Sequence, residues 1–266
     1  YAYNYKFDKI VWAKNYKIPF RSNLKISKNK LIAVNQNNIL YFLNKSNGEM
    51  LSQIPTEETK VKNQFINNLS TNENSTFFLN TYGSLYSINN TTMKINWFLN
   101  LNQSSDLNPS NLFFSSQVVI NNDKLVVATN QFTYVLNANS GKILQKRNFT
   151  SIIKPMILNN YLFLITKNNL LIAVDLNDGK IIYSYNINDQ IADFLKIKKK
   201  QVEFKELMFV NNQIFIYLTN SFLLRFDING RLSDIQKLPN KIKSYPIIVQ
   251  NNLLYLSSKN KLSVLN

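Results

Sequence analysis

One short phrase recurs seven times along the chain: a run of apolar and aromatic residues that ends in Asn or Asp. One copy spans residues 40–44 (LYFLN) and another spans 133–137 (TYVLN), and successive copies end 38 to 52 positions apart. A period in the forties with strand-like content predicts an all-β protein, a β-propeller in which each repeat forms one four-stranded antiparallel blade. The seven copies end at Asn4, Asn44, Asn89, Asn137, Asp175, Asp227 and Asn266.

The residues between the apolar runs are those that close tight turns. Asn tolerates a left-handed backbone better than other non-glycine residues, so a pair such as Asn159-Asn160 can close a hairpin between a first and a second strand. Similar pairs stand at 121–122, 211–212 and 251–252. All five glycines also fall at predicted turns, where a positive φ is needed. We therefore expect hairpin meanders throughout the chain.

This pattern supplies about six blades, which form a single domain over residues 1–266. The chain has no initiator Met and opens inside a copy of the phrase, so we expect an N-terminally truncated propeller that belongs to a seven- or eight-bladed ring. The blades are expected at about 17–56, 60–101, 112–148, 151–187, 202–238 and 241–266, with 1–16 as the tail of a preceding blade.

Composition limits the chemistry that the chain can perform. It contains no Cys and no His, which removes the disulfide, the thiolate and imidazole metal ligands, and the commonest general base. The 15 acidic residues are scattered. Asp175 and Asp227 share a repeat position with Asn, so we interpret them as turn residues that bond the backbone. The adjacent pair Glu57-Glu58 lies in a predicted loop and is expected to be solvated.

The formal net charge of +16 is carried almost entirely by lysine. One interpretation is an anionic partner, either nucleic acid or an anionic membrane surface. The other is coding bias, because Lys, Asn, Ile, Phe and Tyr are all abundant together, as AT-rich coding would produce. The basic run near residue 200 lacks arginine and repeated aromatics, so it gives nucleic acid little support.

Two connections between blades are long, Asn102 to Leu112 and Asn186 to Phe204. Both join a fourth strand to the next first strand, so they share a face with second-to-third-strand turns such as the one at Tyr82. The second connection begins like a helix and ends in lysines. Since loops on one face of a propeller commonly present partners, the candidate partner-binding residues are Tyr82, Asp106, Phe194, Leu195, Lys196, Lys198, Lys199 and Lys200.

The end of each blade resembles the PQQ-like quinoprotein repeat: a third strand, Asn or Asp, Gly-Lys, then Ile-x-Trp or Tyr. The matching segments are 173–183 (AVDLNDGKIIY), 2–12 (AYNYKFDKIVW) and 135–145 (VLNANSGKILQ). The sequence departs from the aromatic position at Ser52, Gln145 and about Asp234, and from the glycine position at Asp8 and Met93. These departures weaken the tryptophan docking of quinoprotein dehydrogenases.

Within this superfamily the chain most resembles the BamB family of outer-membrane protein assembly lipoproteins. The resemblance implies an eight-bladed ring, no bound cofactor, no catalytic or metal site, and a periplasmic scaffold associated with the outer membrane. Its partners would be envelope proteins of the assembly machinery, with no small-molecule substrate. A PQQ- and Ca²⁺-dependent quinoprotein dehydrogenase and a basic propeller that binds nucleic acid are the alternatives.

Overall fold

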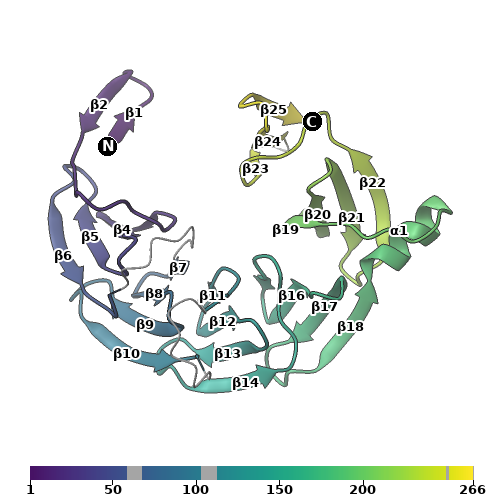
Figure 1. Ribbon diagram of the computed structural model, residues 1–266, viewed down its shortest axis with the longest axis horizontal. Helices are drawn as coiled ribbons and strands as arrows, with labels where there is room; N and C mark the ends of the chain where they lie inside the picture. Colours follow the sequence, from purple (N-terminus) through teal and green to yellow (C-terminus); the bar gives the residue numbers. More distant parts are fainter. Residues whose placement is uncertain (59–67, 103–112, 250–251, 266) are drawn as a thin grey trace. The chain divides into compact units, whose positions relative to one another are not determined.

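The computed structural model describes residues 1–58, 68–102, 113–249 and 252–265. The chain divides into two compact units, Tyr1–Asn148 (unit 1) and Phe149–Asn266 (unit 2), and Figure 1 labels the elements of both. Regular structure is almost entirely β-strand, with one helix in the described part of the chain.

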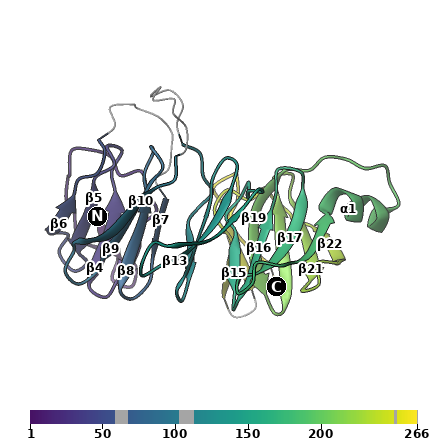
Figure 2. The ribbon, with the colours of Figure 1, turned by 90° about the horizontal axis from the view of Figure 1, so that it is seen from below.

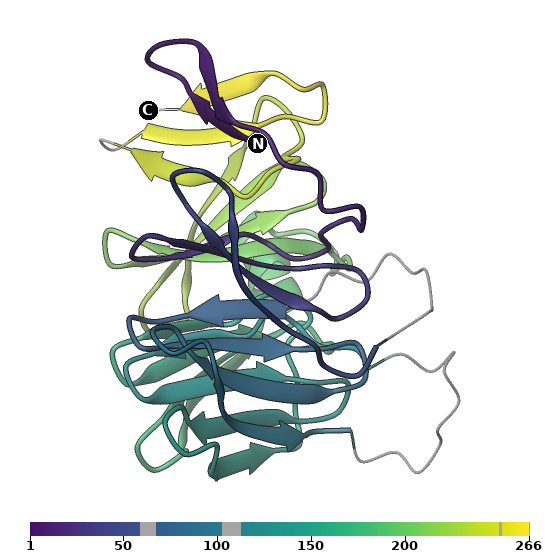
Figure 3. The ribbon, with the colours of Figure 1, turned by 90° about the vertical axis from the view of Figure 1, so that its left-hand side faces the viewer.

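Unit 1 contains a two-stranded hairpin and three four-stranded antiparallel sheets. Each sheet is a meander, because its strands lie side by side in chain order. Figure 3 shows these sheets stacked face to face. The strands are β1 (Ala2–Asn4), β2 (Lys9–Trp12), β3 (Lys25–Ser27), β4 (Lys30–Val34), β5 (Leu40–Asn44), β6 (Met50–Ile54), β7 (Asn68–Thr71), β8 (Ser75–Leu79), β9 (Ser84–Asn89), β10 (Ile95–Asn100), β11 (Val119–Asn121), β12 (Lys124–Ala128), β13 (Thr133–Asn137) and β14 (Ile143–Arg147).

Unit 2 contains two four-stranded meanders and a three-stranded sheet, again antiparallel. The helix α1 follows β18 directly and lies beside β22 (Figure 2). The elements are β15 (Met156–Leu158), β16 (Tyr161–Ile165), β17 (Leu170–Asp175), β18 (Ile181–Asn186), α1 (Ile187–Leu195), β19 (Phe204–Val210), β20 (Gln213–Leu218), β21 (Phe222–Asp227), β22 (Leu232–Lys237), β23 (Ile247–Val249), β24 (Asn252–Leu256) and β25 (Leu262–Leu265).

The predicted fold class is confirmed: the chain is built from four-stranded antiparallel blades of the β-propeller type, about six in number. Each sheet falls within one of the ranges expected for a blade, and the last one has three strands. The single domain and the size of the complete ring remain predictions.

Burial explains why the middle strands read as continuous apolar runs. Every residue of β8 is buried, as are four of the five in β5. A strand covered on both faces loses the alternation of apolar and polar residues that a half-buried strand shows. The fourth strands are different: β10 and β14 alternate exposed with partly buried residues. The core therefore lies on the second and third strands, between neighbouring sheets.

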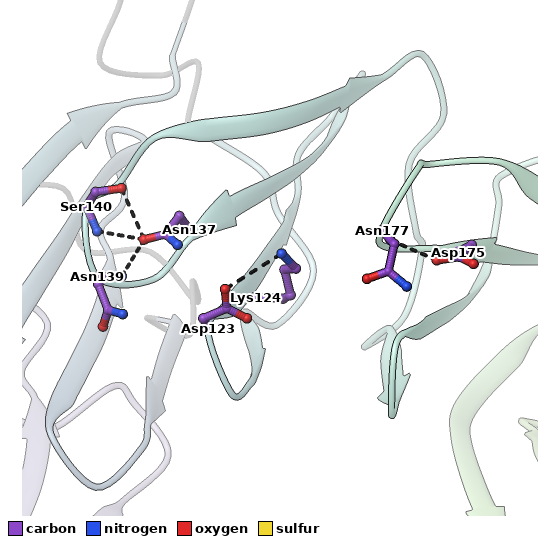
Figure 4. A network of polar contacts seen from close by, with 7 residues as sticks. All are labelled: Asp123, Lys124, Asn137, Asn139, Ser140, Asp175 and Asn177. Atoms are coloured by element: carbon purple, nitrogen blue, oxygen red, sulfur yellow. Dashed lines mark hydrogen bonds and ion pairs between the residues drawn. The ribbon is translucent and has the colours of Figure 1, made fainter.

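Within the described residues, the repeated Asn or Asp closes the turn after the third strand of a sheet. Asn137 accepts backbone N–H bonds from Asn139 at 3.1 Å and Ser140 at 3.0 Å, and Asp175 accepts one from Asn177 at 2.8 Å (Figure 4). Asp227 accepts the N–H of Arg231 at 2.9 Å. The interpretation of both aspartates as turn residues is confirmed. Predicted left-handed turn positions are also confirmed at Asn122, Asn159 and Asn211.

Neighbouring sheets are locked by an aromatic ring that lies on a glycine. The ring of Trp97, on β10, covers Gly141, where φ is +72° and a Cβ would lie 2.8 Å from the indole. The indole Nε1–H donates to the carbonyl of Ala138 at 3.0 Å. The same arrangement recurs as Trp12 on Gly48 and Tyr183 on Gly230. Tyr183, which stands at the position of the tryptophans, therefore also packs its ring on a glycine of the next sheet.

One junction uses a different solution. Met93 occupies the glycine position of its repeat and keeps the positive φ, at 55°. The preceding sheet has Ser52 at the position that holds an aromatic ring in Trp12, Trp97 and Tyr183. The Met93 side chain packs against the core cluster that includes Phe42 and Ile54. A side chain from the turn thus replaces the missing ring from the strand.

Gly141→Ala tests the ring-on-glycine lock. A non-glycine residue in the left-handed region costs roughly 1–2 kcal/mol, and the added Cβ must also displace the Trp97 ring. We expect the free energy of unfolding of the variant to fall by at least ~2 kcal/mol. Urea unfolding followed by tryptophan fluorescence measures the loss. The matched control is Lys142→Ala at the exposed neighbouring position, expected to change stability by less than ~0.5 kcal/mol; equal effects of the two would contradict the lock.

One carboxylic acid lies in the core of unit 2. Glu206, on β19, is 6% exposed and pairs in register with Tyr217 of β20. Burial raises the pKa of Glu206 to about 7, although Lys154 and Lys205 act in the opposite direction. Burial also raises the pKa of the Tyr217 hydroxyl. The folded protein therefore binds a proton at Glu206 more tightly than the unfolded chain does.

This proton makes stability depend on pH. The contribution is fully present below the ordinary pKa of 4.5 and is lost as the pH rises from there to about 7. The loss amounts to about 3 kcal/mol. We expect Glu206→Gln to remove this part of the pH dependence in urea unfolding followed by circular dichroism. Asp193→Asn, at an exposed residue of α1, is the control; a Glu206→Gln profile parallel to the wild type would refute the assignment.

Candidate partner-binding surface

The helix α1 begins at once after β18 because Asn186 caps it. The side-chain oxygen of Asn186 accepts the backbone N–H groups of Asn188 at 2.9 Å and Asp189 at 3.3 Å. Ile187 is fully buried, and its N–H donates to the carbonyl of Asn169 at 2.9 Å. Asp189 in the first turn also favours the positive end of the helix dipole. The predicted helix is confirmed, and it starts at Ile187, directly after the cap.

A single glutamine fastens α1 to the neighbouring blade. Gln190 Nε2 donates to the carbonyl of Gly230 at 2.8 Å, and its Oε1 accepts the N–H of Leu232 at 2.8 Å. Gly230 lies in the turn between β21 and β22, and Leu232 is the first residue of β22. The helix is therefore held against the sheet β19–β22 rather than extended into solvent.

The last turn of α1 and the residues directly after it carry most of the predicted residues. Lys196 ends the helix in the left-handed conformation (φ 54°), and its N–H bonds back to the last turn. Phe194, Leu195 and Ile197 are 47%, 45% and 47% exposed. All the residues from 194 to 200 are exposed, so apolar and basic side chains share one surface. We call residues 194–200 the apolar-basic segment.

A groove lies between the apolar-basic segment and the sheet β19–β22. Its volume is about 310 Å³. One wall is formed by Ile191 and Leu195 of α1 and the other by side chains of β20, β21 and β22, such as Phe222. Lys198 and Lys200 line it as well. A groove with apolar walls and cationic groups at its edge can bind an apolar group that has a negative charge next to it.

One ion pair fixes the course of the lysine run. Lys199 Nζ lies 2.6 Å from Asp189 Oδ1, which ties the segment back to the first turn of the helix. Lys196, Lys198 and Lys200 have no ion-pair partner among the residues that the structure describes. Three cationic groups thus remain available to a ligand.

The structure brings together six of the eight predicted residues. Phe194, Leu195 and the four lysines lie on the apolar-basic segment of unit 2. Tyr82 belongs to unit 1, where it is half-buried in the turn between β8 and β9. Asp106 lies outside the described residues.

Glu57 and Glu58 are both exposed, as expected, but Glu57 also has partners in the hairpin that carries Tyr82. Although the residue is exposed, its carboxylate accepts hydrogen bonds from Ser84 Oγ at 2.6 Å, from Tyr86 OH at 2.8 Å and from Asn80 Nδ2. Partial burial raises the pKa of Glu57, but these donors outweigh it and the net pKa lies below the ordinary value. The donors come from a hairpin more than twenty residues away, which the sequence alone did not associate with Glu57. Glu57 fastens the chain after β6 to that hairpin.

Sequence reasoning missed two residues of the surface. Ile197 lies inside the basic run, and an apolar residue between lysines could have been recognised in the sequence as part of the surface. Gln190 carried no signal, because its partners in the turn at Gly230 stand about forty positions further along the chain.

No group of three or more acidic side chains that could hold a metal gathers in the described ranges. The one described helix is too short and too polar to cross a membrane.

The sequence matches the family described as outer membrane protein assembly factor BamB. The match covers residues 1–185 and, in a second overlapping alignment, residues 83–266. The chain belongs to this family. A comparison with curated proteins gives no match.

Two solved structures have folds similar to that of this chain. The crystal structure of BamB from Moraxella catarrhalis has a TM-score of 0.78 at 11% identity, covering 98% of this chain and 77% of that one. A crystal structure of the computationally designed Ika8 protein has a TM-score of 0.51 at 10% identity, covering 96% and 98%. At these identities the likeness shows the fold alone.

Gln190→Ala tests whether this glutamine holds the surface in place. Loss of two hydrogen bonds of about 1 kcal/mol each should free α1 without unfolding the sheets. We expect trypsin to cleave within residues 196–200 several-fold faster than in the wild type, measured by mass spectrometry of the fragments.

The control for this variant is Gln201→Ala, a second glutamine on the groove that is exposed. Its cleavage rate should match that of the wild type. If both variants are cut at the wild-type rate, Gln190 does not position the segment.

Proposed function

We propose that this protein is a non-enzymatic scaffold that assists outer-membrane protein assembly in the periplasm, associated with the outer membrane. The observation that carries the proposal is the family match, which extends over the whole chain rather than over one blade. The partners would be protein components of the assembly machinery. The fold supports a scaffold role, because its repeated carboxylates close turns instead of converging on a site.

We assign the partner contact to the apolar-basic segment. Interfaces place an apolar centre inside a polar rim, and a few aromatic or aliphatic anchors supply most of the binding energy. Phe194 and Leu195 provide such anchors, and the lysines provide the rim. Gln190 holds the helix that presents them, so little conformational order has to be gained on binding. Tyr82 remains a candidate for a second contact in unit 1.

The test replaces Phe194, Leu195, Lys198, Lys199 and Lys200 with serine together. We expect the affinity for purified barrel-assembly proteins, measured by surface plasmon resonance, to fall at least tenfold while the circular dichroism spectrum is unchanged. The lost apolar anchors and charges are the physical cause.

The control carries serine at Lys259, Lys261 and Leu262, an exposed basic and apolar group on the turn and strand β25 of the same unit. It should bind like the wild type. Failure of the wild type to bind any barrel-assembly protein, or quinone- and Ca²⁺-dependent dye reduction, would overturn the proposed function. Retained binding by the serine variant would overturn only the site.

A further inference from the structure

The groove beside α1 is concave, and this shape restricts what can fill it. Its apolar walls come from the helix on one side and from three strands on the other. A flat lipid surface can touch the exposed Phe194 but cannot enter the space between helix and sheet. A protruding side chain can. The volume of about 310 Å³ stands at the lower limit of the roughly 300–1,000 Å³ of small-molecule pockets, which fits an anchoring side chain better than a whole ligand.

The charges around the groove indicate the sign of the occupant. Lys198 and Lys200 line it, and neither has an ion-pair partner in the described part of the chain. Two acidic side chains stand on α1 near the run: Asp189 is already paired with Lys199, and Asp193 is exposed and does not line the groove. An incoming group that places carboxylates at this rim would therefore gain charge-assisted contacts without displacing an existing pair.

The local backbone keeps the groove open in the unbound protein. Lys196 turns the chain out of the helix, and the pair between Lys199 and Asp189 returns it over the first turn. Gln190 fixes the helix to the far wall of the groove through Gly230 and Leu232. A groove held by contacts on both sides is a preorganised site, which reduces the ordering cost of binding.

We propose that this groove binds a short segment of a partner protein in which one large apolar side chain is flanked by carboxylates. The apolar side chain enters between α1 and the sheet, and the carboxylates meet Lys198 and Lys200. The inference rests on the proposed function in that it names the chemistry of the partner at the same surface.

The test uses a fluorescent decapeptide with a leucine–phenylalanine centre and glutamates on both sides, and follows binding by fluorescence anisotropy. We expect saturable binding that weakens as salt rises, because part of the attraction is screened. The charge reversal Lys198→Glu with Lys200→Glu should weaken it at least tenfold. The matched reversal Lys259→Glu with Lys261→Glu changes unit 2 by the same charge at a distant turn and should alter the affinity less than twofold.

A second variant tests the groove without changing its charge. Ala192, half-buried on α1, lines the groove, so Ala192→Trp should fill it and weaken peptide binding at least tenfold. Leu195→Ser removes part of the wall and serves the same purpose if the tryptophan variant misfolds, which circular dichroism would reveal. Peptides with serines in place of the apolar centre, or lysines in place of the glutamates, should not bind.

The outcomes separate this inference from the proposed function. Equal binding of the lysine-flanked peptide, or unchanged binding by both groove variants, overturns the groove assignment. Binding to phosphatidylglycerol vesicles without binding to the peptide overturns it in favour of a membrane contact. If barrel-assembly proteins bind the wild type while the peptide does not, the inference fails and the function stands. If the peptide binds and no assembly protein does, the function fails and the groove stands.

Discussion

The contact between an aromatic ring and a glycine on the next sheet determines how these blades can stack. A meander of short strands has two apolar faces, and neither is stable until another sheet covers it. The ring of Trp97 sets the spacing at one such junction, because the turn at Gly141 has no side chain to hold it away. Its indole N–H then satisfies a backbone carbonyl at Ala138 that would otherwise lack a donor. Burial of the middle strands depends on this fit.

The sequence determined the blades because their pattern is local. Strand, turn and repeat period are each encoded within about forty residues, and the left-handed Asn positions such as Asn159 follow from the side chain itself. The helix was also visible, but its start at Ile187 was not, since this residue continues the apolar pattern of β18. The cap at Asn186 resolves the ambiguity only when the side-chain contacts are known.

The candidate site was predictable in its composition and not in its shape. Exposed apolar residues next to lysines mark the end of α1 and the residues after it, and six of the predicted residues lie there. The groove forms because β20, β21 and β22 of the next blade supply its other wall. Gln190 holds α1 in place because the turn at Gly230 lies within hydrogen-bond distance. Glu57 shows the same limit, because its donors Ser84 and Tyr86 come from another repeat. Each of these contacts between repeats has one partner, Gln190 or Glu57, that does not belong to the repeat pattern.

The exchange of Ser52 and Met93 has a consequence for how such chains diverge. The junctions at Gly48, Gly141, Gly230 and Met93 each pair a fourth strand with the following sheet's turn, and Ser52 and Met93 stand about forty residues apart. A large residue on one side demands a small one on the other. A single blade moved into another protein would carry its own turn residue and its own fourth-strand residue. Each of these residues is one half of a different junction, so neither junction would be complete. The unit that contains one complete junction is therefore offset from the visible sheet: it runs from one fourth strand to the turn of the next blade.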